Sequence, residues 1–338
     1  MHRCIPFLPS NAQARNFQRR LNISFWRPIW ALFCMLACTV DACPLNAQDD
    51  GIRVSLPSRI QHRSGQSNIR DRAIHSEVKL VLIPVTVTDP LQRPVQGLNK
   101  KNFRVFDEGV EQNVSEVVSE DAPVSIGIVF DASNSMRKKL DDSRQAITEF
   151  LQMSTPGDEF SLMKFSDRPQ PVCSFTTDAG EIEDNLAQIQ TGGWTSLFDA
   201  LYLSMNRMKQ AGHGTKVLFV LSDGGDNNSR YTEGEIKRIV READVRIFSI
   251  SILDHSPSLE RISDESGGRA YRVHKLDELP EMAATLSAEI HSHYVLGYLP
   301  ARAQNDGKYH KVIVKLVPPD GYPRLHVAWR HGYYAPLQ

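Results

Sequence analysis

The pattern of apolar positions changes near residue 123 and again near residue 292, which divides the chain into three parts. Between these points, short apolar runs alternate with segments of helical spacing. The runs S-I-G-I-V-F at 125–130 and K-V-L-F-V-L at 216–221 are apolar on both faces, as buried parallel strands require. Strands that alternate with helices predict an α/β fold, a doubly wound and mostly parallel sheet with helices on both faces.

The individual elements of this middle part follow from the same pattern. Thr232 and Glu235 have the spacing of a capping box and predict the start of a helix. Gly267 is expected to end another helix. The expected strands are 125–130, 159–165, 216–221 and 245–253, and the expected helices are 138–153, 181–189, 197–208, 232–243, 258–266 and 276–290.

The segments on either side alternate with the period of β-strands. Residues 77–89 predict one strand, and residues 102–117 predict two short strands joined at Gly109. Three further strand-like runs follow residue 293. Each flank has about 45 residues, near the length below which a chain seldom folds alone, and together they approach the ~100 residues of an immunoglobulin-like sandwich. We therefore expect one all-β immunoglobulin-like sandwich from residues 77–121 and 293–338, beside an α/β domain at 122–292.

The first 47 residues have the pattern of an export signal. A basic stretch without acidic residues precedes an apolar run at 28–40, and L-N-A closes the region at Ala47. The run is shorter than the ~20 residues that cross a bilayer comfortably. We expect residues 1–47 to be a signal peptide that is removed. The alternatives are a leader retained as an anchor, or lipidation at Cys43, and the membrane is expected as a partner only in these two cases.

Composition and cysteine usage narrow the class of protein. Residues 48–76 are polar and predict a disordered linker. Four of the five cysteines lie in the leader, so the exported part would keep Cys173 alone and no internal disulfide. The formal net charge of −1 gives no global attraction to nucleic acid. No Walker loop or G-x-G-x-x-G follows a strand, so we expect no nucleotide ligand.

Candidate chemistry is concentrated in three loops. D-A-S-N-S-M follows the strand at 125–130, G-G-W-T-S-L-F-D-A precedes the helix at 197–208, and S-D-G-G-D follows the strand at 216–221. Ligands bind at the carboxyl ends of the strands in such sheets, so these loops are expected to converge on an exposed rim. The candidate ligands are Asp131, Ser133, Ser135, Thr195 and Asp223.

These five side chains offer only oxygen atoms. An oxygen set without His or Cys points to a hard cation, Mg²⁺ or else Mn²⁺ or Ca²⁺, and away from zinc or copper. The simpler alternative is that these Asp and Ser side chains only cap helices and turns. Three loops in this order favour the metal site.

The three loops resemble the metal-ion-dependent adhesion site of von Willebrand factor A (VWFA) domains, over residues 122–292. The resemblance implies that Ser133, Ser135 and Thr195 ligate the ion through hydroxyls, and that Asp131 and Asp223 bind it directly or through water. The exported part also resembles a bacterial group known from Acidobacteria, through I-P-V-T-V-T-D, N-F-R-V-F-D-E-G, Y-V-L-G-Y and the closing R-H-G-Y-Y-A-P.

The implied function is metal-dependent adhesion or scaffolding in the cell envelope. The partner would be a protein that presents an acidic residue to the ion, and the location would be periplasmic, envelope-associated or secreted. The alternatives are a structural envelope protein whose ion only stabilises the loops, and a metal-dependent hydrolase. No His or Glu falls in the three loops and no G-x-S-x-G elbow is present, so we expect no enzyme activity and no catalytic residues.

Neighbouring polar residues are given simpler roles. Asp178 and Asp199 are expected to cap helix starts, and Asp226 is expected to lie in a solvated turn. His291 and His293, two positions apart at a helix end, are poorly spaced for a metal.

Overall fold

The computed structural model describes residues 80–337 except 121, 302–305, 320 and 323. The signal peptide expected at 1–47, the linker at 48–76 and the first residues of the strand expected from 77 lie outside the described residues. Within the described part, no helix has both the length and the apolar character needed to cross a membrane.

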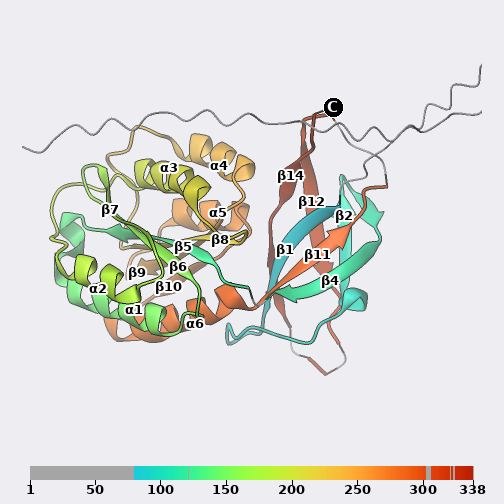
Figure 1. Cartoon of the computed structure of the whole chain (residues 1–338), viewed down its shortest axis with the longest axis horizontal. Coiled ribbons are helices and arrows are strands. Elements are labelled where there is room, and N and C mark those ends of the chain that lie inside the picture. Colours follow the sequence, from blue (N-terminus) through green and yellow to red (C-terminus); the bar gives the residue numbers. More distant parts are fainter. Residues whose placement is uncertain (1–79, 121, 302–305, 320, 323, 338) are drawn as a thin grey trace, which may run out of the picture. The chain divides into compact units, whose positions relative to one another are not determined.

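The middle of the chain forms a six-stranded sheet in the order β10-β9-β8-β5-β6-β7 (Figure 1). All neighbours are parallel except β7, which runs antiparallel to β6. Every residue of β5 and β9 is buried. Burial on both sides explains the apolar run at 126–130 of β5, whereas β9 also buries Arg246, Ser249 and Ser251. The strands are β5 (Ser125–Asp131), β6 (Glu159–Phe165), β7 (Pro169–Thr176), β8 (Lys216–Ser222), β9 (Arg246–Ile252) and β10 (Ala270–Val273).

Helices cover both faces of this sheet (Figure 1). The side chains of α1, α2 and α6 pack in one apolar cluster with Ile128 of β5. Those of α3, α4 and α5 pack in a second cluster with Val129, the next residue along the same strand. The helices are α1 (Leu140–Gln152), α2 (Ala179–Ala187), α3 (Leu197–Arg207), α4 (Glu233–Glu242), α5 (Pro257–Glu265) and α6 (Leu279–His291), with short 3-10 turns at Lys100–Asn102, Asn134–Lys138, Met208–Gln210 and Leu276–Glu278. The doubly wound, mostly parallel α/β fold is confirmed.

Two helix starts follow the sequence chemistry. Thr232 caps α4 in a capping box with Glu235, as expected. Asp178 caps α2 and accepts the backbone N–H of Gly180 at 2.9 Å, also as expected. Gly267 follows α5 with a φ of 79°, a backbone conformation that residues with a side chain rarely adopt.

Strands from the two ends of the described chain pair with each other. In one sheet, of order β13-β1-β11-β4, Val85 stands opposite Tyr294, and in another, of order β14-β12-β2-β3, Val105 stands opposite Val314. Apolar side chains of both sheets share one core cluster. The strands are β1 (Val81–Thr88), β2 (Phe103–Asp107), β3 (Val110–Gln112), β4 (Val114–Glu120), β11 (His293–Tyr298), β12 (Tyr309–Leu316), β13 (His326–Trp329) and β14 (Gly332–Tyr334). The likeness to an immunoglobulin fold and the domain boundaries stay predictions.

The sequence pattern missed several strands. Residues 103–120 hold three strands where two were expected, and the third of them, β4, belongs to a different sheet from β2 and β3. The strands β7, β10 and β14 were also not expected. β7 begins P-Q-P, and proline is tolerated in a sheet mainly on an edge strand, which is where β7 lies.

Candidate functional site

Four of the five candidate ligands lie at or shortly after the carboxyl ends of two neighbouring strands. Asp131 is the last residue of β5, and Asp223 directly follows β8, which pairs with β5 in the sheet. The remaining loop, the second along the chain, precedes α3 and carries Thr195. The fold therefore brings three loops, far apart in the sequence, to one edge of the sheet.

The first loop turns back on its own carboxylate. Asp131 is fully buried, and its Oδ1 accepts the backbone N–H of Ser133 at 2.9 Å. The hydroxyl oxygens of Ser133 and Ser135 lie 2.9 Å apart. Ser133 is buried, whereas Ser135 is exposed, so the pair leads from the interior to the surface. The expectation of an exposed rim is wrong for Asp131, Ser133, Thr195 and Asp223, which are all buried, and holds for Ser135. Asp131 is buried because β5 is central in the sheet.

The other two loops complete the cluster. Ser135 Oγ donates to Asp223 Oδ1 at 2.8 Å. Thr195 lines the same hollow, of about 360 Å³, as Ser133 and Ser135. The backbone N–H of Thr195 donates to Asn227 Oδ1 at 2.8 Å, which fixes the position of this loop. All five predicted residues thus belong to one group of neighbouring side chains.

Backbone contacts tie the loops together. Asn134 N donates to Gly193 O at 3.1 Å, and Gly192 N donates to Ala132 O at 2.8 Å. Gly193 has a φ of 80°, and a Cβ there would lie 2.6 Å from the Asp167 carboxylate. Glycine is therefore required at Gly193 by its positive φ and by the close approach of Asp167, whereas a side chain at Gly192 would meet open space.

Burial determines the electrostatics of Asp131. Removal from water raises the pKa of this carboxyl to about 6, and the negative charge of Asp223 adds to the effect. Hydrogen bonds from the Ser222 hydroxyl, at 2.5 Å from Asp131 Oδ2, and from Ser133 oppose it. Asp131 is therefore a carboxylate whose negative charge is poorly compensated by its surroundings.

A lysine that the sequence analysis did not select lies in the site. Lys139 Nζ is 2.5 Å from Asp223 Oδ2, and the two side chains are only 13% and 2% exposed. The available signal was the R-K-K run at 137–139, directly after D-A-S-N-S-M, but a basic run beside a loop is normally a solvated surface. Ser222 was likewise given no role.

The oxygen positions fit a small divalent ion. In an octahedral shell with oxygens at about 2.0–2.1 Å, adjacent ligand oxygens lie about 2.9 Å apart. The hydrogen-bonded separations of 2.9 Å between Ser133 Oγ and Ser135 Oγ and of 2.8 Å between Ser135 Oγ and Asp223 Oδ1 are close to this spacing, which is also the length of an ordinary O–H···O bond. The donor set of carboxylates and hydroxyls also suits a hard cation.

Two neighbouring acidic residues have roles that differ from the expected ones. Asp199 does not cap the start of α3; its Oδ1 accepts the backbone N–H groups of Arg230, at 2.8 Å, and Tyr231, at 3.2 Å. Asp226 is half-buried rather than solvated, and its carboxylate accepts the N–H of Phe198 at 3.3 Å. Both carboxylates hold the segment after β8 against α3.

The two histidines of the α6 end contact protein groups. His291 Nε2 lies 2.8 Å from Asp158 Oδ2, and His293 is buried with its Nδ1 3.2 Å from Ile290 O. Trp194, by contrast, lines the hollow beside Thr195 and is 65% exposed, which is unusual for so large an apolar side chain.

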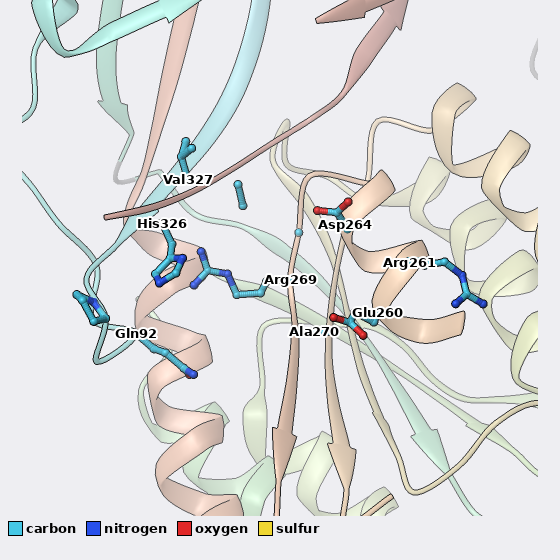
Figure 2. A pocket seen from close by; sticks show the side chains of 11 residues that line it. Gln92, Glu260, Arg261, Asp264, Arg269, Ala270, His326 and Val327 are labelled. Carbon is cyan, nitrogen blue, oxygen red and sulfur yellow. The ribbon is translucent and has the colours of Figure 1, made fainter. Parts of the chain in front are cut away.

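A second hollow, of about 620 Å³, lies beside α5 (Figure 2). Figure 2 shows the side chains of Arg269 and His326 close together, and Asp264 farther away on α5. Arg269 Nη1 donates to Thr88 Oγ1 at 2.7 Å, so this arginine already has a protein partner. None of the five candidate ligands lines this hollow.

Comparison with known families identifies the middle of the chain. Residues 125–285 match the family model of the von Willebrand factor type A domain. This range contains all five candidate ligands, and the chain therefore contains a von Willebrand factor type A domain.

Two curated relatives are similar to part of this chain. Inter-alpha-trypsin inhibitor heavy chain H4 of Homo sapiens is 27% identical over 171 residues, which are 45% of this chain and 18% of the relative. The protein of the same name from Bos taurus is 27% identical over 171 residues, 45% of this chain and 19% of the relative. The chain thus spans about a fifth of the length of these relatives.

Solved structures are also similar to the chain. A von Willebrand factor type A protein from Catenulispora acidiphila is 14% identical, with 77% of this chain and 75% of that one covered and a TM-score of 0.47. Proximal thread matrix protein 1 from the mussel byssus, with a zinc occupied MIDAS motif, is 17% identical, with 54% and 48% covered and a TM-score of 0.45.

Proposed function

We propose that this von Willebrand factor type A domain is a metal-dependent protein-binding module, which holds a divalent cation, Mg²⁺ or else Mn²⁺ or Ca²⁺, and coordinates an acidic group of a partner through it. The observation that carries the proposal is the chain of oxygens from Ser133 through Ser135 to Asp223, each within 2.9 Å of the next. Ser133 and Ser135 line a hollow that Thr195 also lines, so a ligand can reach this end of the group from outside, whereas Asp223 lies behind it and is buried.

The residues divide into two chemical groups. Asp131 and Asp223 would provide the two negative charges that retain a divalent ion. The hydroxyls of Ser133, Ser135 and Thr195 would bind without adding charge. When bound, the ion supplies a positive centre that attracts one more oxygen ligand. Because the hydroxyls are neutral, only the two carboxylates offset the charge of the ion. A coordination position then remains for the carboxylate oxygen of a partner.

The alternative of a purely structural ion has less support. The loops are already joined by the hydrogen bonds of Asn134 and Gly192, and Thr195 is held by Asn227. An ion is therefore not needed to bring these loops together. This favours a role for the ion in binding an external group.

We propose no catalytic activity for this site. The described residues that line the hollow are Ser133, Asn134, Ser135, Gly193, Trp194, Thr195 and Asn227. None of these side chains readily accepts a proton near neutral pH, which a general base for activating water would have to do. The carboxylates of Asp131 and Asp223 do not line the hollow. Assays against generic esters and phosphoesters test the hydrolase alternative directly.

We propose an exported location for the module, in the periplasm, on the cell envelope or secreted, with the flanking sheets as an immunoglobulin-like support. The basic leader, its apolar run and the resemblance to exported proteins support this location. N-terminal sequencing of protein from an envelope fraction should begin near Gln48. An intact Met1 in a soluble cytoplasmic fraction would contradict export, and a lipid on Cys43 would indicate a membrane anchor.

Calorimetric titration tests the metal site. Mg²⁺, Mn²⁺, Ca²⁺ and Zn²⁺ are titrated into wild type, Asp131→Asn and the control Asp184→Ala. Asn keeps the shape of the buried Asp131 and removes its charge, while Asp184 is an exposed residue of α2 and gives the same loss of one charge. We expect binding to wild type and Asp184→Ala but not to Asp131→Asn. No binding by wild type at millimolar ion, or equal binding by Asp131→Asn, contradicts the site.

A pull-down tests the partner. The protein is used as bait in an envelope extract with Mg²⁺ or with EDTA, and Asp131→Asn serves as a second bait. A partner retained only by wild type in Mg²⁺ supports the proposed binding role. A partner retained equally in EDTA indicates that the ion is structural.

A further inference from the structure

Lys139 places a positive charge inside the candidate metal site. Its Nζ lies 2.5 Å from Asp223 Oδ2, and both side chains are largely shielded from water. The other oxygen, Asp223 Oδ1, accepts from Ser135 Oγ at 2.8 Å. One carboxylate is thus shared between the hydroxyls that would bind an ion and an ammonium of this chain.

We propose, relying on the metal-binding function above, that Lys139 is a tethered cation that competes with the divalent ion for the charge of Asp223. Ionised Asp131 and Asp223 together carry a charge of −2, and Lys139 offsets one unit of it without any ion. An entering ion either displaces the ammonium or tolerates its repulsion at short range, where shielding by water is weak. In both cases Lys139 lowers the affinity for the ion.

The same contact stabilises the ion-free domain. Asp223 is 2% exposed, and a buried carboxylate without a positive partner is strongly unfavourable. Lys139 supplies that partner whenever the ion is absent. The domain therefore stays folded without an ion, and loading of the site depends on the concentration of divalent ions around the protein.

Three variants of the full chain test this inference. Lys139→Met removes the ammonium and keeps an unbranched side chain. Lys138→Met is the matched control, because Lys138 is the preceding residue, carries the same charge and is exposed. Lys139→Arg retains the positive charge. Mn²⁺ affinity is measured by calorimetry, and thermal unfolding is followed in EDTA and in saturating Mn²⁺.

Lys139→Met is expected to bind Mn²⁺ on the order of tenfold more tightly than wild type. In EDTA its midpoint of thermal unfolding should fall by roughly 5–10 °C, and saturating Mn²⁺ should restore much of this loss. Lys138→Met and Lys139→Arg should resemble wild type in both measurements. If Lys139→Met folds only when Mn²⁺ is present, that result supports the inference, and Lys139→Gln then provides the affinity measurement.

The opposite result has a clear meaning. In that case Lys139→Met and Lys139→Gln both bind Mn²⁺ only as tightly as wild type or more weakly, while wild-type binding is intact. Lys139 would then only position Asp223, and the inference would be wrong. That result would leave the proposed metal-binding function standing. Failure of the proposed function is recognised separately, since wild type itself would then bind no ion.

Discussion

Replacing Ser222 by Ala removes the hydroxyl that donates to the buried carboxylate of Asp131. The two oxygens are 2.5 Å apart, and Ser222 and Asp131 are 1% and 0% exposed, so bulk water cannot easily replace the lost donor. A hydrogen bond to a charged group contributes about 1.5–3 kcal/mol. We expect Ser222→Ala to lose this amount of unfolding free energy in EDTA at pH 7.5. Ion affinity should fall about 10- to 100-fold, because Ser222 orients Asp131.

Urea denaturation in EDTA and calorimetric Mn²⁺ titration measure the two effects. Ser143→Ala is the matched control, because Ser143 is also fully buried but its Oγ has no hydrogen-bond partner among the described residues. This control should change stability by no more than ~0.5 kcal/mol, or stabilise slightly, and leave ion binding intact. If Ser222→Ala and Ser143→Ala behaved alike in both assays, the reasoning about Asp131 would be refuted.

Three further predictions concern other parts of the chain. Trp194→Ala should weaken partner binding about tenfold or more in a pull-down titration while Mn²⁺ affinity stays unchanged, because this exposed side chain lines the hollow without supplying an oxygen ligand; a partner bound equally well would exclude Trp194 from the interface. Burial raises the pKa of Glu289 from 4.5 to about 7, so the stability of the folded state falls as pH rises between these values. Glu289→Gln should therefore exceed wild type in unfolding free energy by about 3 kcal/mol at pH 8 and match it near pH 4.5, measured by urea denaturation, and a pH-independent difference would contradict this. Deleting residues 293–338 removes β11 from between β1 and β4 and should cause aggregation in light scattering; a soluble, protease-resistant β fragment from the truncated protein would argue against shared folding.

Local patterns in the sequence were sufficient to predict the α/β fold and to select the candidate ligands, whose metal binding stays a prediction. A strand buried on both faces must be apolar throughout, so β5 and β8 could be recognised from 125–130 and 216–221 alone. The capping box of Thr232 and Glu235 acts within one helical turn and is likewise visible in the sequence. The three loop motifs and their oxygen-only donor set are also visible in the sequence, and they led to the five candidate residues.

Only the tertiary structure decided which side chains meet and how far each is buried. Lys139 contacts Asp223 across 84 positions of the chain, and Ser222 contacts Asp131 across 91. Neither short-range periodicity nor residue type encodes such pairs, because a lysine after a loop can extend into water as readily as it can pair with a buried carboxylate. The capping role expected for Asp199 was wrong for the same reason, since its backbone partners lie 31 and 32 residues away. The sequence by itself thus determined the elements and the donor chemistry, whereas long-range packing determined the charge balance around the donors.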